Sequence, residues 1–239
     1  MFRKKYKEDV MGNKRFKLKK TNVFDYATYL FVIVVFVIVT ALNSAGALNR
    51  SQQGWLVPAC CYIVMAISLN LTVGIMGELS LGHAGFMSVG AFSGAIVSTA
   101  LADSVPDKWL RLLLAIIIGA VLAGIMGFLI GIPVLRLRGD YLAIVTLAFG
   151  EIIRSVIINL DFTGGASGLK GTPQDSTFLV AAIVVLITLV IAFNLTQSKQ
   201  GRAIMALRDN RIAAEAMGIN VTYYKLLAFV VAAFFAGVA

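Results

Sequence analysis

Charged residues are scarce in this 239-residue chain: they make up 14% of it, whereas 59% of the residues are apolar. Soluble globular domains average roughly 25% charged and 45–50% apolar residues, so that class is excluded. The apolar residues gather in continuous runs of roughly 18–22, enough to cross a hydrocarbon core about 30 Å thick. These runs lack the polar alternation of membrane β-barrel strands. The composition therefore predicts an all-α, polytopic transmembrane helical bundle.

Histidine and cysteine are also rare, with one His and two Cys. Cys60 and Cys61 are adjacent, and neighbouring side chains on a helix point about 100° apart. We therefore expect small core or lipid-facing residues rather than a disulfide. A metal centre would have too few of its usual ligands, and we expect no cofactor. His83 lies beside a Gly-rich bend, where it is either a hydrogen-bonded structural residue or a proton relay.

The net charge of +9 is concentrated near the N-terminus. Nine Lys and Arg residues lie within residues 1–26, against three acids. We interpret residues 1–26 as a basic cytoplasmic tail that faces anionic lipid headgroups, and we expect no nucleic-acid partner. A tail that contacts RNA or another partner is the alternative.

Seven hydrophobic segments follow this tail, and residues 27–239 form the expected transmembrane domain. The segments are residues 27–48, 54–76, 84–102, 109–132, 141–160, 177–195 and 223–239. With the N-terminus inside, sixteen basic residues fall on the inner side and four on the outer side, as the positive-inside rule requires. The last segment stops at Ala239 without a polar flank, so we expect the chain to be shorter than its relatives at this end.

Six glycines between Gly74 and Gly94 surround a polar break in the apolar pattern. No Lys or Arg occurs between Trp55 and Asp103 to hold this break at the surface. It is either a turn on the inner side or a stretch that lines a cavity, where unwound backbone is tolerated. The residues of this break that we assign to a candidate translocation path are Gly77, Glu78, Ser80, Gly82 and His83.

A second polar pattern lies inside the apolar segment 141–160. Glu151 and Arg154 are three residues apart on one helix and can form an ion pair. Thr146, Gly150 and Arg154 share one stripe of that helix. Because a charge near the bilayer centre is costly, we expect the pair to face the bundle or a wet cavity. A translocation path through Thr146, Glu151 and Arg154 and a purely structural ion pair are both compatible with this pattern.

The polar segment between the last two apolar runs has the sequence SKQGRAIMALRDNRIAAEAMGINV, residues 198–221. Asp209 or Asn210 can cap a short helix, and Gly218 can end it with a left-handed residue. Such a helix is either a docking element for a partner in the cytoplasm or a solvated connector. The residues assigned to the docking element, within residues 196–222, are Gly201, Arg202, Arg208, Ala213, Ala214, Glu215 and Gly218.

Three segments together resemble the permease subunits of branched-chain amino-acid ABC importers, and their M-type subunit in particular. They are residues 68–92, 139–169 and 198–221, in the order of that family. The pattern Ala213-Ala214-x-x-x-Gly218 resembles the loop of such permeases that docks the ATPase, although Ile212 stands where that loop has Glu. The resemblance implies a helical permease in the bacterial cytoplasmic membrane.

The resemblance also implies partners: a second permease of the H-type, two ABC ATPases and an extracytoplasmic binding protein. The phosphate-cradling pattern G-x-x-x-x-G-K-[ST] does not occur in this sequence, so we expect a non-catalytic subunit whose partners bind ATP. Two alternatives stay open. One is an importer of urea or a short amide, and the other is an ion- or proton-coupled secondary transporter that uses His83, Glu151 and Arg154.

Overall fold

The structure is a computed structural model that describes residues 18–46, 48–102, 104–137, 139–173 and 175–239. Every regular element in these ranges is a helix, which confirms the predicted all-α class. The chain divides into two compact units, residues 1–54 and 55–239, and each is described by itself.

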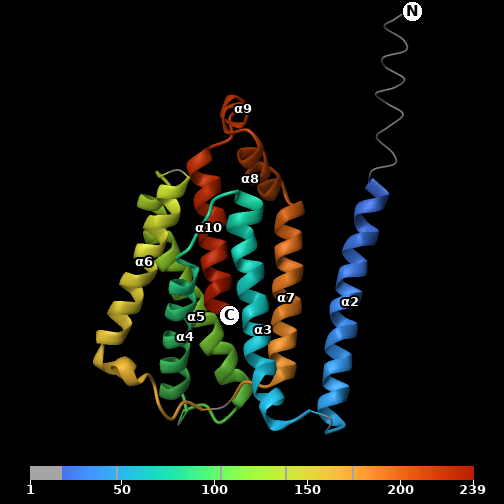
Figure 1. Cartoon of the computed structure of the whole chain (residues 1–239), viewed down its shortest axis with the longest axis vertical. Helices are drawn as coiled ribbons and strands as arrows, with labels where there is room; N and C mark the ends of the chain where they lie inside the picture. The colour runs from blue at the N-terminus through green and yellow to red at the C-terminus, as the bar shows by residue number, and fades with distance from the viewer. Residues whose placement is uncertain (1–17, 47, 103, 138, 174) are drawn as a thin grey trace, which may run out of the picture. The chain divides into compact units, whose positions relative to one another are not determined.

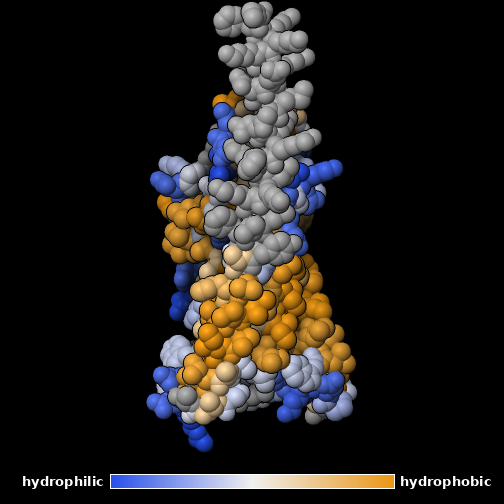
Figure 2. Space-filling model, turned by 90° about the vertical axis from the view of Figure 1, so that its right-hand side faces the viewer, coloured by the Kyte–Doolittle hydropathy of each residue, from blue (hydrophilic) through white to orange (hydrophobic). Residues whose placement is uncertain are grey.

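The first unit contains helix α2 (Leu18–Ser44), whose apolar residues 27–44 are long enough to cross a membrane. The predicted basic tail, residues 1–26, lies outside the described residues as far as residue 17. Leu30 and Phe31 are both 67% exposed, and the surface along the helix is largely hydrophobic (Figure 2). Apolar side chains so exposed are typical of a helix that lies in lipid.

The second unit is a helical bundle with a cap of short helices at one end (Figure 1). Its elements in chain order are α3 (Arg50–Asn70, of which residues 50–54 belong to the first unit), the π-helix η1 (Leu71–Met76), α4 (His83–Ala100), α5 (Lys108–Val134), α6 (Asp140–Asn159), the 3-10 helices η2 (Asp161–Thr163) and η3 (Gly165–Ser167), α7 (Phe178–Gln197), α8 (Lys199–Asp209), α9 (Arg211–Ala216) and α10 (Val221–Val238). The predicted segments and the observed helices agree within a few residues at most ends.

Six helices of the described residues are long and apolar enough to span a membrane: α2, α3 with η1, α5, α6, α7 and α10. The remaining predicted segment, residues 84–102, is the 18-residue helix α4, which is not among the six. Its length does not exclude it, because α10 also has 18 residues; its mean hydropathy is lower, since it contains His83 and several Gly, Ser and Thr residues. In Figure 1 the break before it descends into the bundle, so that α4 begins below the start of α10. The prediction of about seven hydrophobic segments is thus roughly matched: six are candidate spans, and the seventh, α4, is a less apolar helix.

Three glycines bring α4, α5 and α10 together at the centre of the bundle. A methyl group on Gly90 of α4 would lie 2.4 Å from the carbonyl oxygen of Gly237 in α10. One on Gly119 of α5 would lie 2.7 Å from the Gly90 carbonyl oxygen. Small residues of this kind let helix backbones approach closely in membranes, where packing replaces the hydrophobic effect as the driving force. These three helices form the closely packed centre of the unit.

Within this unit the connections alternate between the two ends, as the predicted topology requires. The segment between η1 and α4, the end of α5 with the start of α6, and the α8–α9 segment lie toward one end, and the end of α4, the start of α5, η2 and η3 lie at the other (Figure 1). The polar α8–α9 segment and the break at Gly77 are therefore neighbours in space.

Candidate functional site

The polar segment after α7 folds into two helices, α8 and α9, which we call the docking hairpin. Ser198 caps α8 by accepting from the Gly201 amide at 3.0 Å, and Asn210 caps α9 by accepting from the Ala213 amide at 3.0 Å. Of the two predicted caps for α9, Asn210 is thus the one used, and Asp209 ends α8. Gly201 is buried where α7 turns into α8, and a side chain there would meet the Leu195 carbonyl oxygen at 2.2 Å.

Helix α9 ends at Gly218, which has the predicted left-handed conformation with φ of +83°. The Ile219 amide donates to the Ala214 carbonyl at 3.1 Å, which satisfies one of the carbonyls that a helix end leaves unpaired. Ala214 faces inward and packs with Leu207 and Val221. The caps at both ends therefore fix α9, a helix too short to be stable by itself.

The outer surface of the docking hairpin carries two large apolar side chains. Ile212 is 80% exposed and Met217 is 82% exposed. Arg211 donates to Glu215 at 2.8 Å beside them, and Ala213 is exposed on the same short helix. Apolar side chains presented among charges are typical of a surface that a protein partner covers.

Arg208 joins the docking hairpin to the membrane helix α3–η1. Its Nη1 donates to the carbonyl oxygen of Gly74 at 2.7 Å, while Nε and Nη2 donate to Asp209. Its side-chain carbons also lie over Gly77, where an added Cβ would be 2.5 Å from the Arg208 Cγ. The hairpin is thus in direct contact with the predicted break.

The break begins where the π-helix ends. Gly77 adopts φ of +76°, and the amides of Gly77 and Glu78 both donate to the Thr72 carbonyl. Glu78 then forms an ion pair with Lys225 of α10; the two side chains are 14% and 10% exposed. π-helical turns are rare and are found disproportionately at functional sites, which fits the predicted role of this stretch.

The extended residues after Glu78 lie against α6. The Leu81 amide donates to Oγ1 of Thr146 at 3.1 Å, and this hydroxyl in turn donates to the Ala143 carbonyl at 2.8 Å. Ser80 is only 3% exposed, and its Oγ has no hydrogen-bond partner among the described residues. A side chain of α6 thus satisfies unwound backbone, as is required at membrane depth.

Glycines allow this close contact between the break and α6. An added Cβ on Gly82 would lie 2.0 Å from the Thr146 carbonyl oxygen, and one on Gly150 would lie 3.2 Å from the Gly82 Cα. Thr146 and Gly150, two members of the predicted stripe on α6, therefore both face the break. Arg154, the third member, does not.

His83 is buried at the start of α4 and links three helices. Its Nε2 lies 2.9 Å from Ser68 Oγ, which donates its proton to the Ala232 carbonyl at 2.6 Å. Because that hydroxyl proton is already used, Nε2 must carry the hydrogen and donate to Ser68. Nδ1 has no partner in the described part of the chain. The arrangement supports the structural interpretation of His83 over the proton relay.

The predicted pair of Glu151 and Arg154 forms, at 3.2 Å, but it faces away from the bundle. Its side chains are 64% and 69% exposed. The expectation that this chain's own bundle encloses the pair is wrong. Helix α6 turns its small residues Thr146 and Gly150 toward the break. Because four residues exceed one 3.6-residue turn, each step of four rotates by about 40°, so Arg154 lies about 80° and Glu151 about 140° around the helix from Thr146.

Sequence reasoning missed an ion pair at the opposite end of the bundle. Arg111 of α5 donates through Nε to Asp175 at 2.6 Å and also through Nη2, and Ser98 of α4 lies 3.5 Å from the same carboxylate. The hydrogen bond from Arg111 holds the pKa of Asp175 below its ordinary value. The side chains are 9% and 4% exposed. The only sequence signal was an isolated Asp in the long outer loop.

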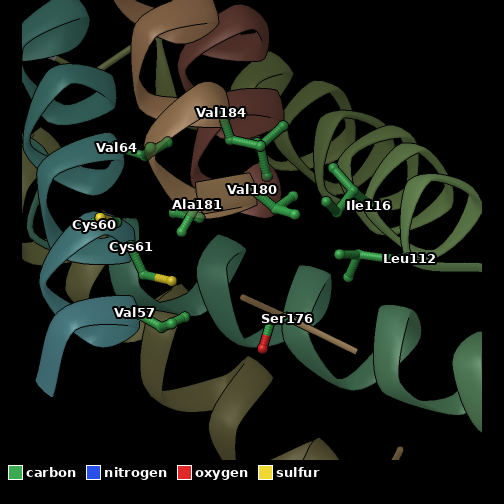
Figure 3. A pocket seen from close by; sticks show the side chains of 12 residues that line it. Val57, Cys60, Cys61, Val64, Leu112, Ile116, Ser176, Val180, Ala181 and Val184 are labelled. Atoms are coloured by element: carbon green, nitrogen blue, oxygen red, sulfur yellow. The ribbon is translucent and has the colours of Figure 1, made fainter. Parts of the chain in front are cut away.

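A cavity of about 190 Å³ lies between α3, α5 and α7 (Figure 3). Val57 and Cys61 of α3 face Leu112 and Ile116 of α5 across it, with Ser176 at its edge. The walls are largely apolar, and the candidate path residues do not line it. The cavity therefore does not connect the break with α6.

The structure thus separates the predicted site residues into two groups. One group lies together at or beside the break: Gly77, Glu78, Ser80, Gly82, His83, Thr146 and Arg208. The other lies on outer surfaces: Arg202, Ala213, Glu215, Gly218, Glu151 and Arg154. Gly201 and Ala214 belong to neither group, because they are buried inside the docking hairpin.

A family model described as the permease component of a branched-chain amino acid transport system matches residues 51–239. This match covers most of the chain, including the break, α6 and the docking hairpin. The chain belongs to this permease family. Membership makes it a non-catalytic membrane component and agrees with the cytoplasmic-membrane location that the sequence predicts.

Individual relatives agree with the family match. The high-affinity branched-chain amino acid transport system permease protein LivM of Salmonella typhimurium is 34% identical in an alignment of 248 residues, and the match covers 88% of this chain and 56% of that protein. The LivM protein of Escherichia coli is 34% identical in an alignment of 213 residues, and the match covers 74% of this chain and 48% of that protein.

A probable branched-chain amino acid transport permease protein LivM of Methanocaldococcus jannaschii is 26% identical over 203 residues, with 69% of this chain and 59% of that protein covered. The chain therefore spans about half the length of the curated relatives it matches. No solved structure matches the chain significantly.

Proposed function

We propose that this chain forms part of the permease subunit of an ABC importer for branched-chain amino acids. In this proposal it binds no ATP or other cofactor itself and couples its transmembrane helices to separate ATPase subunits. The observation that carries the proposal is the docking hairpin: a doubly capped polar element that presents Ile212 and Met217 outward and contacts the break inward through Arg208.

The two ATPases are the proposed occupants of the hairpin surface. A short helix whose exposed apolar residues are anchors fits the helix-in-groove mode of recognition. Ile212 stands at the position where the general loop pattern has Glu. Its 80% exposure therefore predicts an apolar contact in place of a charged one. Arg211 and Glu215 flank the anchors and would fix the orientation of the partner.

A second permease subunit is the proposed cover for the outward face of α6. An ionised side chain within a membrane helix normally faces protein or water rather than lipid. Glu151 and Arg154, 64% and 69% exposed in this chain, therefore call for protein or a water-filled path beside them. We place the translocation path between this face and its counterpart on the H-type partner. The break contacts a different face of α6, at Thr146 and Gly150, and would act on the path through that helix.

Branched-chain amino acids are the proposed cargo because the similar LivM proteins are named as branched-chain amino acid permeases. An extracytoplasmic binding protein would deliver them to the end of the bundle that holds η2 and η3. Urea or a short amide is the competing cargo within the same class. Both of these ABC importers should keep their uptake when a protonophore is present and ATP is held constant. A proton-coupled transporter should lose its uptake under the same conditions.

The test replaces Gly218 with valine in the complete importer. A β-branched residue cannot adopt φ of +83° without a cost of about 1–2 kcal/mol, so the end of α9 should shift. We expect weaker copurification of the ATPases and less leucine uptake for each ATP hydrolysed.

The matched control is Gly171→Val. Gly171 has φ of +77° and, like Gly218, nothing within 4 Å of an added Cβ, but it lies in the outer loop. This variant should keep its ATPases. A Gly218→Val importer that takes up as much leucine for each ATP hydrolysed as the wild type would contradict the proposed docking role. Inhibition of leucine uptake by urea but not by valine would contradict the proposed cargo.

A further inference from the structure

We infer that Arg208 is a positioning residue that ties the movement of the docking hairpin to the end of helix α3–η1. The inference rests on the proposed function, because it assumes that an ATPase displaces the hairpin. It adds a specific connection: the guanidinium of Arg208, in the docking hairpin, caps the end of the membrane-spanning helix α3–η1.

The contact from Arg208 supplies a hydrogen-bond donor that the end of helix α3–η1 lacks. A helix leaves its last carbonyl groups without donors. Here the chain leaves helical geometry at Gly77, and the next amides, of Gly77 and Glu78, both donate to the single carbonyl of Thr72. The Gly74 carbonyl receives its hydrogen bond from Arg208 at 2.7 Å. A cation at this position also stabilises the negative end of the helix dipole.

The contact is steric as well as electrostatic. Only a glycine at position 77 lets the Arg208 side chain lie across the backbone, since an added Cβ would be 2.5 Å from Cγ and 3.2 Å from Cδ. The same residue needs its left-handed φ of +76° to end the helix. Arg208 therefore contacts the point at which the chain turns into the break.

The break also contacts two other helices, α10 and α6. Glu78, next to Gly77, pairs with Lys225 at the start of α10. Leu81 and Gly82, a few residues further along, contact Thr146 of α6. A displacement of α8 that withdraws Arg208 would leave the Gly74 carbonyl without its donor. The break between these contacts is then free to change its conformation.

The experiment compares Arg208→Ala with the wild type in proteoliposomes that contain the complete importer. We expect the ATPases to remain bound and the ratio of leucine transported to ATP hydrolysed to fall about fivefold or more, the low end of coupling between two sites. A reporter cysteine, Leu81→Cys, is placed in a Cys60→Ala, Cys61→Ala background. Its reactivity toward a water-soluble thiol reagent should depend on nucleotide in the wild type and lose that dependence in Arg208→Ala.

Three variants serve as controls. Lys199→Ala removes an exposed cation from the first turn of the same helix, at a residue that is not among those assigned to the docking element, and should leave the ratio unchanged. Arg208→Lys keeps a charged donor and should recover part of the ratio. Ile67→Cys, within α3, should stay unreactive in every state. Size-exclusion profiles confirm that each variant is folded.

The inference is overturned if Arg208→Ala keeps the wild-type ratio and the nucleotide-dependent reactivity of Leu81→Cys. It is also overturned if transport and ATPase binding fall in parallel with an unchanged ratio, because Arg208 would then be only a docking contact. Absence of recovery in Arg208→Lys counts against the cap. A wild-type importer that binds no ATPase would instead overturn the proposed function itself.

Discussion

Two ion pairs of this protein lie in contrasting surroundings. The pair of Arg111 and Asp175 joins α5 to the outer loop across 64 positions of sequence, and its side chains are 9% and 4% exposed. The pair of Glu151 and Arg154 joins adjacent turns of α6, with side chains 64% and 69% exposed. The first holds the chain's own fold together, whereas the second contributes almost nothing to it.

This difference shows what each pair is for. A buried, bidentate pair leaves an uncompensated charge when one partner is lost, so Arg111 and Asp175 fix the outer end of the bundle. An exposed pair at i and i+3 has a small effect on stability. Because the exposed pair lies within a membrane helix, its value must come from what surrounds α6 in the assembled protein.

The largest effect is expected from Arg111→Ala. It leaves the Asp175 carboxylate buried without its main partner, and we expect the amount of folded protein in the membrane to fall several-fold. Quantitative immunoblots of membrane fractions measure this. The double variant Arg111→Leu, Asp175→Leu removes both charges and should restore much of the lost amount; a double variant as scarce as the single one would contradict this assignment.

The pH dependence sharpens the same prediction. Because Arg111 lowers the pKa of Asp175 in the folded protein, the stabilisation is present above the unfolded pKa of about 3.9 and is lost as the pH falls through the lower folded value. Heat-stability differences between the wild type and Asp175→Asn should therefore stay constant between about pH 7 and 5 and shrink only below about pH 4. A difference that already disappears near neutral pH would exclude this pair as its source.

An intermediate effect is expected from Glu78 and Lys225, whose side chains are 14% and 10% exposed. Lys225→Ala should reduce heat stability, because Glu78 is then left partly buried and unpaired. The exchange Glu78→Lys with Lys225→Glu should recover part of that stability by restoring opposite charges across the break. If the exchanged protein is less stable than the Lys225→Ala variant, attraction between these two charges does not hold the pair together.

The smallest effect is expected from Glu151 and Arg154. In a double-mutant cycle on the isolated chain, their interaction should be about 0.2–0.5 kcal/mol, the value for exposed helix pairs. The same cycle in the assembled importer should give a larger value if a second permease covers α6. A coupling well above about 1 kcal/mol in the isolated chain would contradict the outward placement of this pair.

The sequence predicted most features that depend on neighbouring residues. Apolar runs gave the helices within a few residues, since their length is set by membrane thickness. Asn210 and Gly218 predicted the two ends of α9, because capping and left-handed geometry depend on residue type at one position. The i, i+3 spacing of Glu151 and Arg154 predicted their ion pair for the same local reason.

Only the tertiary structure decided which residues meet across the bundle. Arg208 reaches Gly74 over 134 positions, and Lys225 reaches Glu78 over 147. The sequence by itself determined a helical membrane protein with a short capped helix in its polar segment, but it did not determine which side of α6 is buried. Lipid is as apolar as a protein interior, so an apolar helix face does not reveal whether it packs against lipid or against another helix.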